Sequence, residues 1–72
     1  MGEPAEDDVA IVEDGIFLWS GRGFLVADPQ YRMYHGPFDT IEKARERRQM
    51  IENMDGWIPS ATKYNPDYMV FA

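Results

Sequence analysis

The side chains that could carry chemistry in this 72-residue chain are few and scattered. The single histidine, His35, stands beside a Gly-Pro pair, without a second metal ligand or a paired nucleophile at a recognisable spacing. Ser20 and Ser60 lack a base at the spacing of known serine-nucleophile motifs. Because catalysis needs several groups in one constellation, the sequence predicts a protein that is not an enzyme and has no catalytic residues.

The sequence gives as little support for a metal or cofactor site as for a catalytic site. The acidic pairs Asp7-Asp8 and Glu13-Asp14 lack the alternating order and the distant Glu of a calcium loop. There is no cysteine, which excludes a thiolate zinc site, a disulfide framework and thiol catalysis. The stretch Gly21-Arg22-Gly23 is too short for a phosphate loop and lacks its Gly-Lys-Ser/Thr ending. We therefore predict no metal ion and no cofactor.

Aromatic residues are the stronger indication of function. The chain holds more of them than a core of this size obviously needs, and tryptophan and tyrosine dominate the energetics of protein interfaces. We predict a partner-binding surface built from Trp19, Trp57, Tyr64, Tyr68, Phe71, Glu13 and Asp14. The alternative is that most of these aromatic side chains belong to the core, although so small a domain is not expected to bury all of them.

The charge of the chain limits the classes of partner that it is expected to bind. Thirteen acidic residues against seven basic ones give a net charge of −6, and residues 1–21 hold acidic residues but no base. Binding of nucleic acid normally requires a basic patch, so DNA and RNA are not expected as direct ligands. No apolar run reaches the length of a membrane span, and the lack of cysteine fits a reducing cytoplasm. We predict a cytoplasmic protein that does not contact a membrane.

The element that organises the chain is a strand, a corner and a helix over residues 31–54. The aromatic run at 31–34 predicts a strand, and Gly36 and Pro37 break it, since proline cannot donate a ladder hydrogen bond. Phe38 is expected to fill the junction between sheet and helix. Asp39 is the predicted N-cap, with an acidic residue three positions later in the manner of a capping box.

The helix is predicted over about residues 39–54. Its residues favour helix formation, and a stripe at helical spacing contains Ile41, Ala44, Ile51 and Met54, with Met50 beside it. Arg47 and Arg48 occupy the middle of this stripe, where their stems can follow the core edge while their charges reach water. Gly56 is the expected left-handed residue that ends the helix.

Turn signals at Asp14-Gly15 and at residues 20–23 and 28–30 separate three short apolar runs that precede this element. The run at 16–20 is apolar on both faces, which indicates a central strand or a face kept for a partner. We predict an α+β domain, an antiparallel meander of three to four strands packed against one α-helix, over residues 9–72 after a disordered acidic tail at 1–8.

The C-terminal part is harder to place. Residues 57–64 could add an edge strand, limited by Pro59. The β-prone run at 68–71 either docks into the sheet or stays exposed. Docking is favoured, because an exposed apolar strand promotes aggregation.

Two resemblances attach to His35-Gly36-Pro37-Phe38-Asp39-Thr40-Ile41-Glu42-Lys43-Ala44. The junction is similar to the Gly-Pro-Phe-x-(Ser/Thr)-x-x-x-Ala pattern of SPOR domains, bacterial modules that bind peptidoglycan glycan strands. It also looks like that of very small proteins encoded by phages and mobile elements, in which a β-meander runs into Gly-Pro-Phe-Asp-Thr and one helix. The second resemblance covers more of the chain, roughly residues 16–54. It implies a short accessory factor that binds and alters a host protein.

The leading functional prediction is therefore a non-enzymatic protein-binding module, a phage-type accessory protein that inhibits or modulates a host protein in the host cytoplasm. The acidic charge favours a target that handles nucleic acid, such as RNA polymerase, a nuclease or a CRISPR effector. The alternatives are a SPOR-like glycan-binding module, a small enzyme, and a homodimer that pairs through residues 68–71. The sequence leaves open whether the chain is a monomer or a homodimer.

Overall fold

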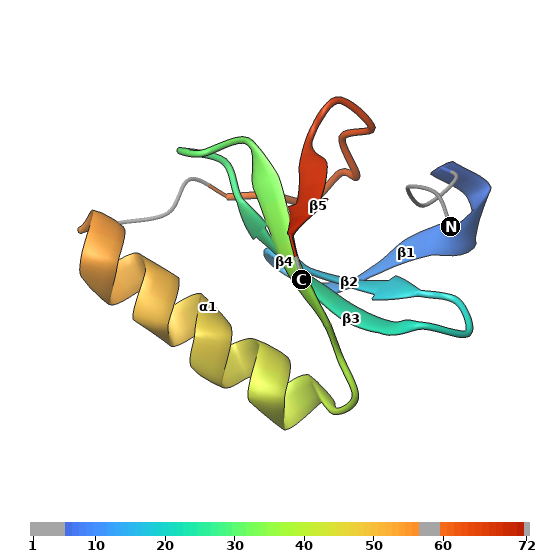
Figure 1. The fold of residues 1–72 in the computed structure, drawn as a ribbon, viewed down its shortest axis with the longest axis horizontal. Helices are drawn as coiled ribbons and strands as arrows, with labels where there is room; N and C mark the ends of the chain where they lie inside the picture. The colour runs from blue at the N-terminus through green and yellow to red at the C-terminus, as the bar shows by residue number, and fades with distance from the viewer. Residues whose placement is uncertain (1–5, 57–59, 72) are drawn as a thin grey trace.

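The computed structural model describes residues 6–56 and 60–71, which form one α-helix and one five-stranded sheet (Figure 1). The sheet has the strand order β1-β2-β3-β4-β5. The elements are η1 (Glu6–Asp8), β1 (Val9–Glu13), β2 (Ile16–Trp19), β3 (Gly23–Asp28), β4 (Met33–Phe38), α1 (Ile41–Asp55) and β5 (Met69–Phe71). The predicted class, a meander packed against one helix, is confirmed.

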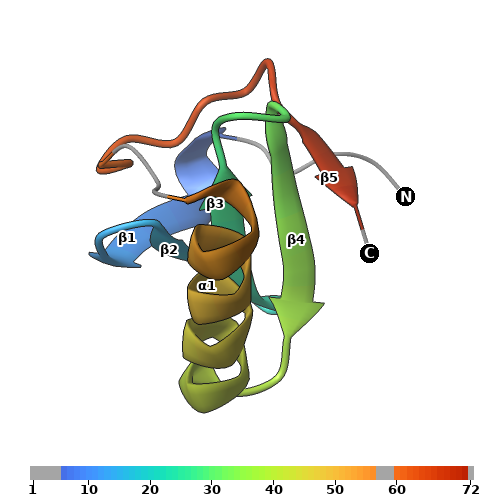
Figure 2. The ribbon, with the colours of Figure 1, turned by 90° about the vertical axis from the view of Figure 1, so that its left-hand side faces the viewer.

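The first four strands pair antiparallel with their chain neighbours, and β5 joins β4 in parallel. A parallel pair needs a crossover connection, which α1 and the residues after it provide. Figure 2 shows β5 beside β4, with α1 lying across the sheet. The predicted C-terminal strand therefore exists, at the sheet edge opposite β1.

Two expectations about the ends of the chain need correction. The edge strand expected at 57–64 is absent over residues 60–64, which form no strand, and residues 57–59 lie outside the described residues. The expected disordered tail also differs at Glu6–Asp8, which form a 3₁₀ turn. Within the described chain, no helix has the length and apolar character needed to cross a membrane.

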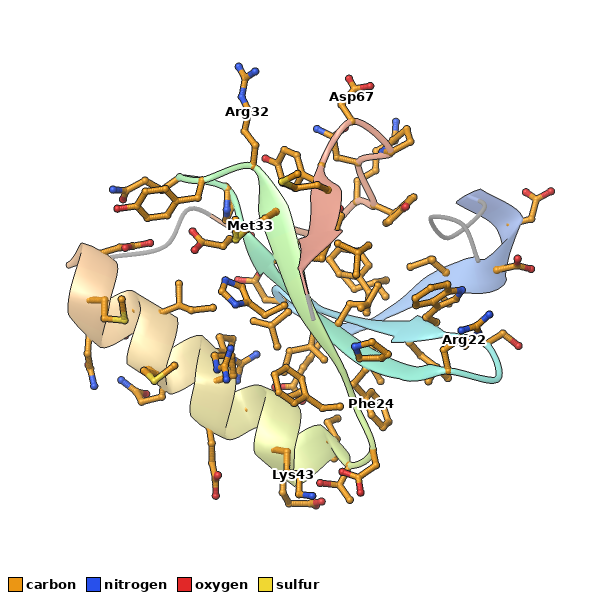
Figure 3. All side chains as sticks on the ribbon, viewed as in Figure 1. Arg22, Phe24, Arg32, Met33, Lys43 and Asp67 are labelled. Carbon is orange, nitrogen blue, oxygen red and sulfur yellow. The ribbon has the colours of Figure 1, made fainter. Side chains whose placement is uncertain are left out.

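Helix α1 covers one face of the sheet. Its buried residues Ala44 and Ile51 pack against Ile16 and Val26, with Phe24 and Phe38 partly buried at the margin. Figure 3 shows side chains filling the space between α1 and the strands, with Phe24 toward the start of the helix. Met54, which the sequence placed in the apolar stripe, and Met50, which it placed beside the stripe, are both exposed.

A second core lies on the opposite face. Here the connection between α1 and β5 covers the sheet, through partly buried Ala61 and Tyr68 and buried Tyr64. The sheet residues beneath it are Phe17, Trp19, Leu25, Ala27 and Tyr34. The apolar pattern on both faces of residues 16–20 is explained by this arrangement, since β2 is an interior strand with a layer over each face.

The junction between β4 and α1 brings backbones unusually close together. Gly36 has φ of 128°, and a Cβ atom there would lie 2.6 Å from the carbonyl oxygen of Phe24. The Gly36–Pro37 peptide bond is cis. Phe38 packs at the margin of the helix-side core. Glycine at position 36 is therefore required both by its dihedral angle and by the lack of space.

The helix begins one residue later than predicted. Thr40, in an extended conformation, is the N-cap, and its hydroxyl accepts a hydrogen bond from the Lys43 amide at 3.2 Å. Asp39 instead forms an exposed ion pair with the Lys43 ammonium at 3.0 Å. At the other end, the Gly56 amide donates to the Glu52 carbonyl with φ of 87°, as expected of a glycine that ends a helix.

Candidate protein-binding surface

The aromatic residues predicted to bind a partner lie mainly in the second core. Trp19 is 9% exposed and Tyr64 is 8% exposed, while Tyr68 is partly buried. The ring of Tyr64 stacks on Tyr34 at a centroid distance of 5.2 Å, and Tyr68 contacts the same ring at 5.3 Å. Trp57 lies outside the described residues, and only the main chain of Phe71 is described. The aromatic surplus is thus largely used to build a core on the face that α1 leaves free.

Glu13 holds the end of β1 against the helix. Its Oε1 accepts hydrogen bonds from Arg45 Nε at 3.1 Å and Arg45 Nη2 at 2.8 Å, and its Oε2 lies 2.8 Å from Arg48 Nη1. The hydrogen bond from Arg45 is the main reason that the pKa of Glu13 falls below its ordinary value of 4.5. The predicted binding residue Glu13 therefore already has two intramolecular partners.

Asp14 holds the segment that covers the opposite face of the sheet. Its Oδ1 accepts hydrogen bonds from the Ser60 hydroxyl at 3.0 Å and the Ala61 amide at 2.8 Å. The Asp14 carbonyl also accepts from Arg48 Nη1 at 2.7 Å. The β1–β2 turn consequently joins the helix, the sheet and the covering segment. These contacts carry no local sequence signal, because all of their partners lie more than thirty positions away.

Exposed apolar side chains occur on both faces of the ribbon formed by β1 and β2, and the predicted binding residues did not include them. Ala10 is exposed, and Ile11, Val12 and Leu18 keep between 40% and 45% of their surface accessible. We call these four residues the ribbon patch. The position of this strand in the chain could have indicated its exposure, because the first strand of a meander has a neighbouring strand on one side only.

The main-chain groups of β1 also face an open edge. The Ser20 amide donates to the Asp8 carbonyl at 2.8 Å, which makes Asp8 and Ser20 a hydrogen-bonded pair. Hydrogen-bonded and non-hydrogen-bonded pairs alternate along an antiparallel ladder, so Ala10 is bonded to Leu18. The N–H and C=O groups of Val9 and Ile11 therefore point away from β2, toward the edge of the sheet.

A polar cluster lies at the helix side of β3 and β4. Asp28, only 4% exposed, contacts His35 Nε2 through its Oδ2 at 3.3 Å, and His35 Nδ1 lies 3.2 Å from Arg47 Nη1. Arginine can only donate, so His35 Nδ1 accepts and Nε2 carries the proton that is donated to Asp28. This arrangement places the imidazole between one guanidinium and one carboxyl group.

Asp55, the last residue of α1, completes the cluster. Its carboxyl lies beside that of Asp28. Loss of hydration, together with the charge and hydrogen bonding of Asp28, raises the pKa of Asp55 above its ordinary value of 3.8. The Oδ1 atom of Asp28 is buried and has no hydrogen-bond partner among the described residues.

In the described part of the chain, no three His, Asp or Glu side chains are grouped closely enough to hold a metal ion. Next to Ile11 of the ribbon patch there is an open groove. It is lined by Val9, Ile11, Phe17, Thr62, Lys63 and Tyr64.

Comparison with family models, with curated proteins and with solved structures finds no significant match to this chain. Its function is therefore inferred from the surface itself.

Proposed function

We propose that this chain is a non-enzymatic protein-binding module that binds a host protein and inhibits or modulates it, in the manner of a phage-type accessory protein. The observation that carries the proposal is the ribbon patch, Ala10, Ile11, Val12 and Leu18, which is exposed directly after the acidic residues Asp7 and Asp8. Ala10 and Leu18 lie on the helix side of the sheet and Ile11 lies on the side of Phe17, so exposed apolar side chains border the edge strand on both faces. Exposed apolar side chains at an open sheet edge are typical of an interaction surface.

Charge supports a basic partner. Several of the seven basic side chains have partners within the chain: Lys43 pairs with Asp39, and Arg45 and Arg48 pair with Glu13. Asp7 and Asp8 are exposed, and the chain keeps a net charge of −6. An acidic surface of this kind complements the basic groove of a protein that handles nucleic acid, such as RNA polymerase, a nuclease or a CRISPR effector.

The experiment is an affinity capture from bacterial lysate on the immobilised chain, washed at low and then at high salt. We expect one stoichiometric protein that is released at high salt, because exposed charges are screened. The double variant Asp7→Asn with Asp8→Asn should weaken binding of that protein and flatten its salt dependence. Asp67→Asn, at an exposed position on the far loop, is the matched control and should change neither.

Other outcomes would contradict the proposal. Failure to capture a stoichiometric protein from any tested lysate would remove the protein-binding function. Enrichment of cell-wall glycan would favour the SPOR-like alternative. Turnover of a substrate by the purified chain would show that the chain is an enzyme.

A further inference from the structure

The open edge of β1 has the features of a site for strand addition. Beyond β1 the described sheet has no further strand, and the outward N–H and C=O groups belong to Val9 and Ile11. An added strand satisfies such groups with its own main chain, and its side chains then lie against those of the edge strand. The regular part of the edge is short, because the register shifts between Ile11 and Glu13.

The charges at the two ends of β1 indicate which kind of strand can bind along this edge. Asp7 and Asp8 carry exposed carboxylates at the start of β1, whereas the charge of Glu13 at its end is balanced by two arginines. A second copy of the chain would bring the same carboxylates and another net charge of −6, so self-pairing is opposed by repulsion. A strand with a basic end has the complementary charge.

We propose that the edge of β1 binds an extended segment of a partner protein by strand addition, with lysine or arginine at the end of the segment that meets Asp7 and Asp8. Apolar residues of the segment lie against the ribbon patch. This inference rests on the proposed function, since it names the feature of the partner that the module recognises.

Ile11 allows the main-chain contact to be tested with little damage to the sheet. Its N–H points outward, so Ile11→Pro removes a donor to the partner and no ladder bond to β2. Ile11→Ala shortens the side chain and keeps the donor, which makes it the matched variant. Ile11→Lys adds a positive charge at the edge and serves as a second blocking variant if the proline variant fails to fold.

The probe is a synthetic peptide of alternating valine and threonine with two lysines at each end, titrated into labelled chain and followed by amide chemical shifts. We expect the largest shifts at Val9 and Ile11, and a dissociation constant at least about ten-fold higher for a glutamate-ended peptide. I11P and I11K should abolish binding, whereas I11A, which removes apolar contact and keeps the N–H donor, should weaken it less than either. Shifts centred elsewhere, no shifts, or equal binding of the two peptides would overturn the proposal, as would dimerisation of the chain through β1.

The lysate capture separates this inference from the proposed function. A partner that binds wild-type and I11P chains equally would overturn strand addition and leave the protein-binding function intact. If neither chain captures a partner, the proposed function fails, while the peptide titration still decides whether the edge accepts a basic strand.

Discussion

The carboxyl of Asp55, at the end of α1, lies beside the carboxyl of Asp28 on β3. Asp55 is the last residue of α1, so the two acids lie where the end of the helix meets the sheet. His35 on β4 contacts Asp28, and Arg47 on the helix contacts His35. The pair makes the docking of α1 sensitive to pH.

Asp55→Asn should stabilise the protein at neutral pH. The pKa of Asp55 is raised on folding, so the native state binds the proton more tightly than the unfolded state. Stability is then lost as pH rises from the unfolded value of 3.8 through the folded one. The carboxamide of the variant supplies an N–H donor at every pH. Thermal unfolding from pH 3 to pH 8 should show a higher Tm for the variant at the upper end and convergence at the lower end, with D67N as control.

Glu13→Gln should have the opposite pH dependence. Hydrogen bonding by Arg45 lowers the pKa of Glu13, so its contribution is present above the unfolded value of 4.5 and disappears as pH falls through the folded value. We expect lower stability than wild type at pH 7 and no difference in strong acid. Glu46→Gln, on the exposed side of α1, removes the same charge and should have little effect. A pH-independent loss in E13Q would contradict this account.

Tyr34→Phe should loosen the layer that covers the second core. The Tyr34 hydroxyl accepts a hydrogen bond from the Asn65 amide at 2.6 Å, and the ring is fully buried. Removing the acceptor leaves a partly buried N–H without its partner, which costs about 1 to 3 kcal/mol. Urea denaturation measures the loss. Tyr31→Phe removes an exposed hydroxyl, and equal stability of the two variants would disprove the role of the hydrogen bond.

Gly36→Ala should destabilise the fold more than Gly21→Ala. Both residues have positive φ, but a Cβ atom at position 21 meets nothing within 4 Å, whereas one at position 36 meets the Phe24 carbonyl oxygen at 2.6 Å. We expect a loss of about 1 kcal/mol for G21A and at least about twice that for G36A. Chemical denaturation measures both losses. G21A reports the cost of the positive φ alone, and the additional loss in G36A reports the steric clash with the Phe24 carbonyl.

Thr40→Ala should lower stability by about 1 kcal/mol, the usual cost of losing an N-cap. Asp39→Ala should cost less, since it removes only the exposed pair with Lys43. The reverse order in thermal unfolding would restore Asp39 as the cap.

The meander and the helix could be predicted because their signals are local. Asp14-Gly15 indicated a turn, and Gly56 ends the helix with positive φ. Adjacent Asp39 and Thr40 are both good caps, so the start of the helix was misplaced by one residue. The edge strand expected at 57–64 is absent over residues 60–64. Their polar groups hydrogen-bond Asp14 and their aromatic ring packs on the sheet face, which are long-range contacts.

The surface was harder to predict than the fold. Trp19 and Tyr64 suggested binding by residue type, yet the second core buries both. Asp28 before Pro29 is typical of a turn, and nothing local connects it to Asp55, which is 27 positions further along the chain. The exposure of Ile11 follows from sheet order, a property that emerges only when all five strands are placed.

The two layers over the sheet give the molecule two separate ways to open. If the segment at residues 60–68 lifts away, Phe17 and Leu25 meet water while Ala44 and Ile51 stay packed on the other face. Amide hydrogens of β2 and β3 should therefore exchange with solvent only when both layers leave, and those of β1 when the edge alone frays. The sheet thus separates two covering layers, and either layer can detach from its face while the other layer stays packed.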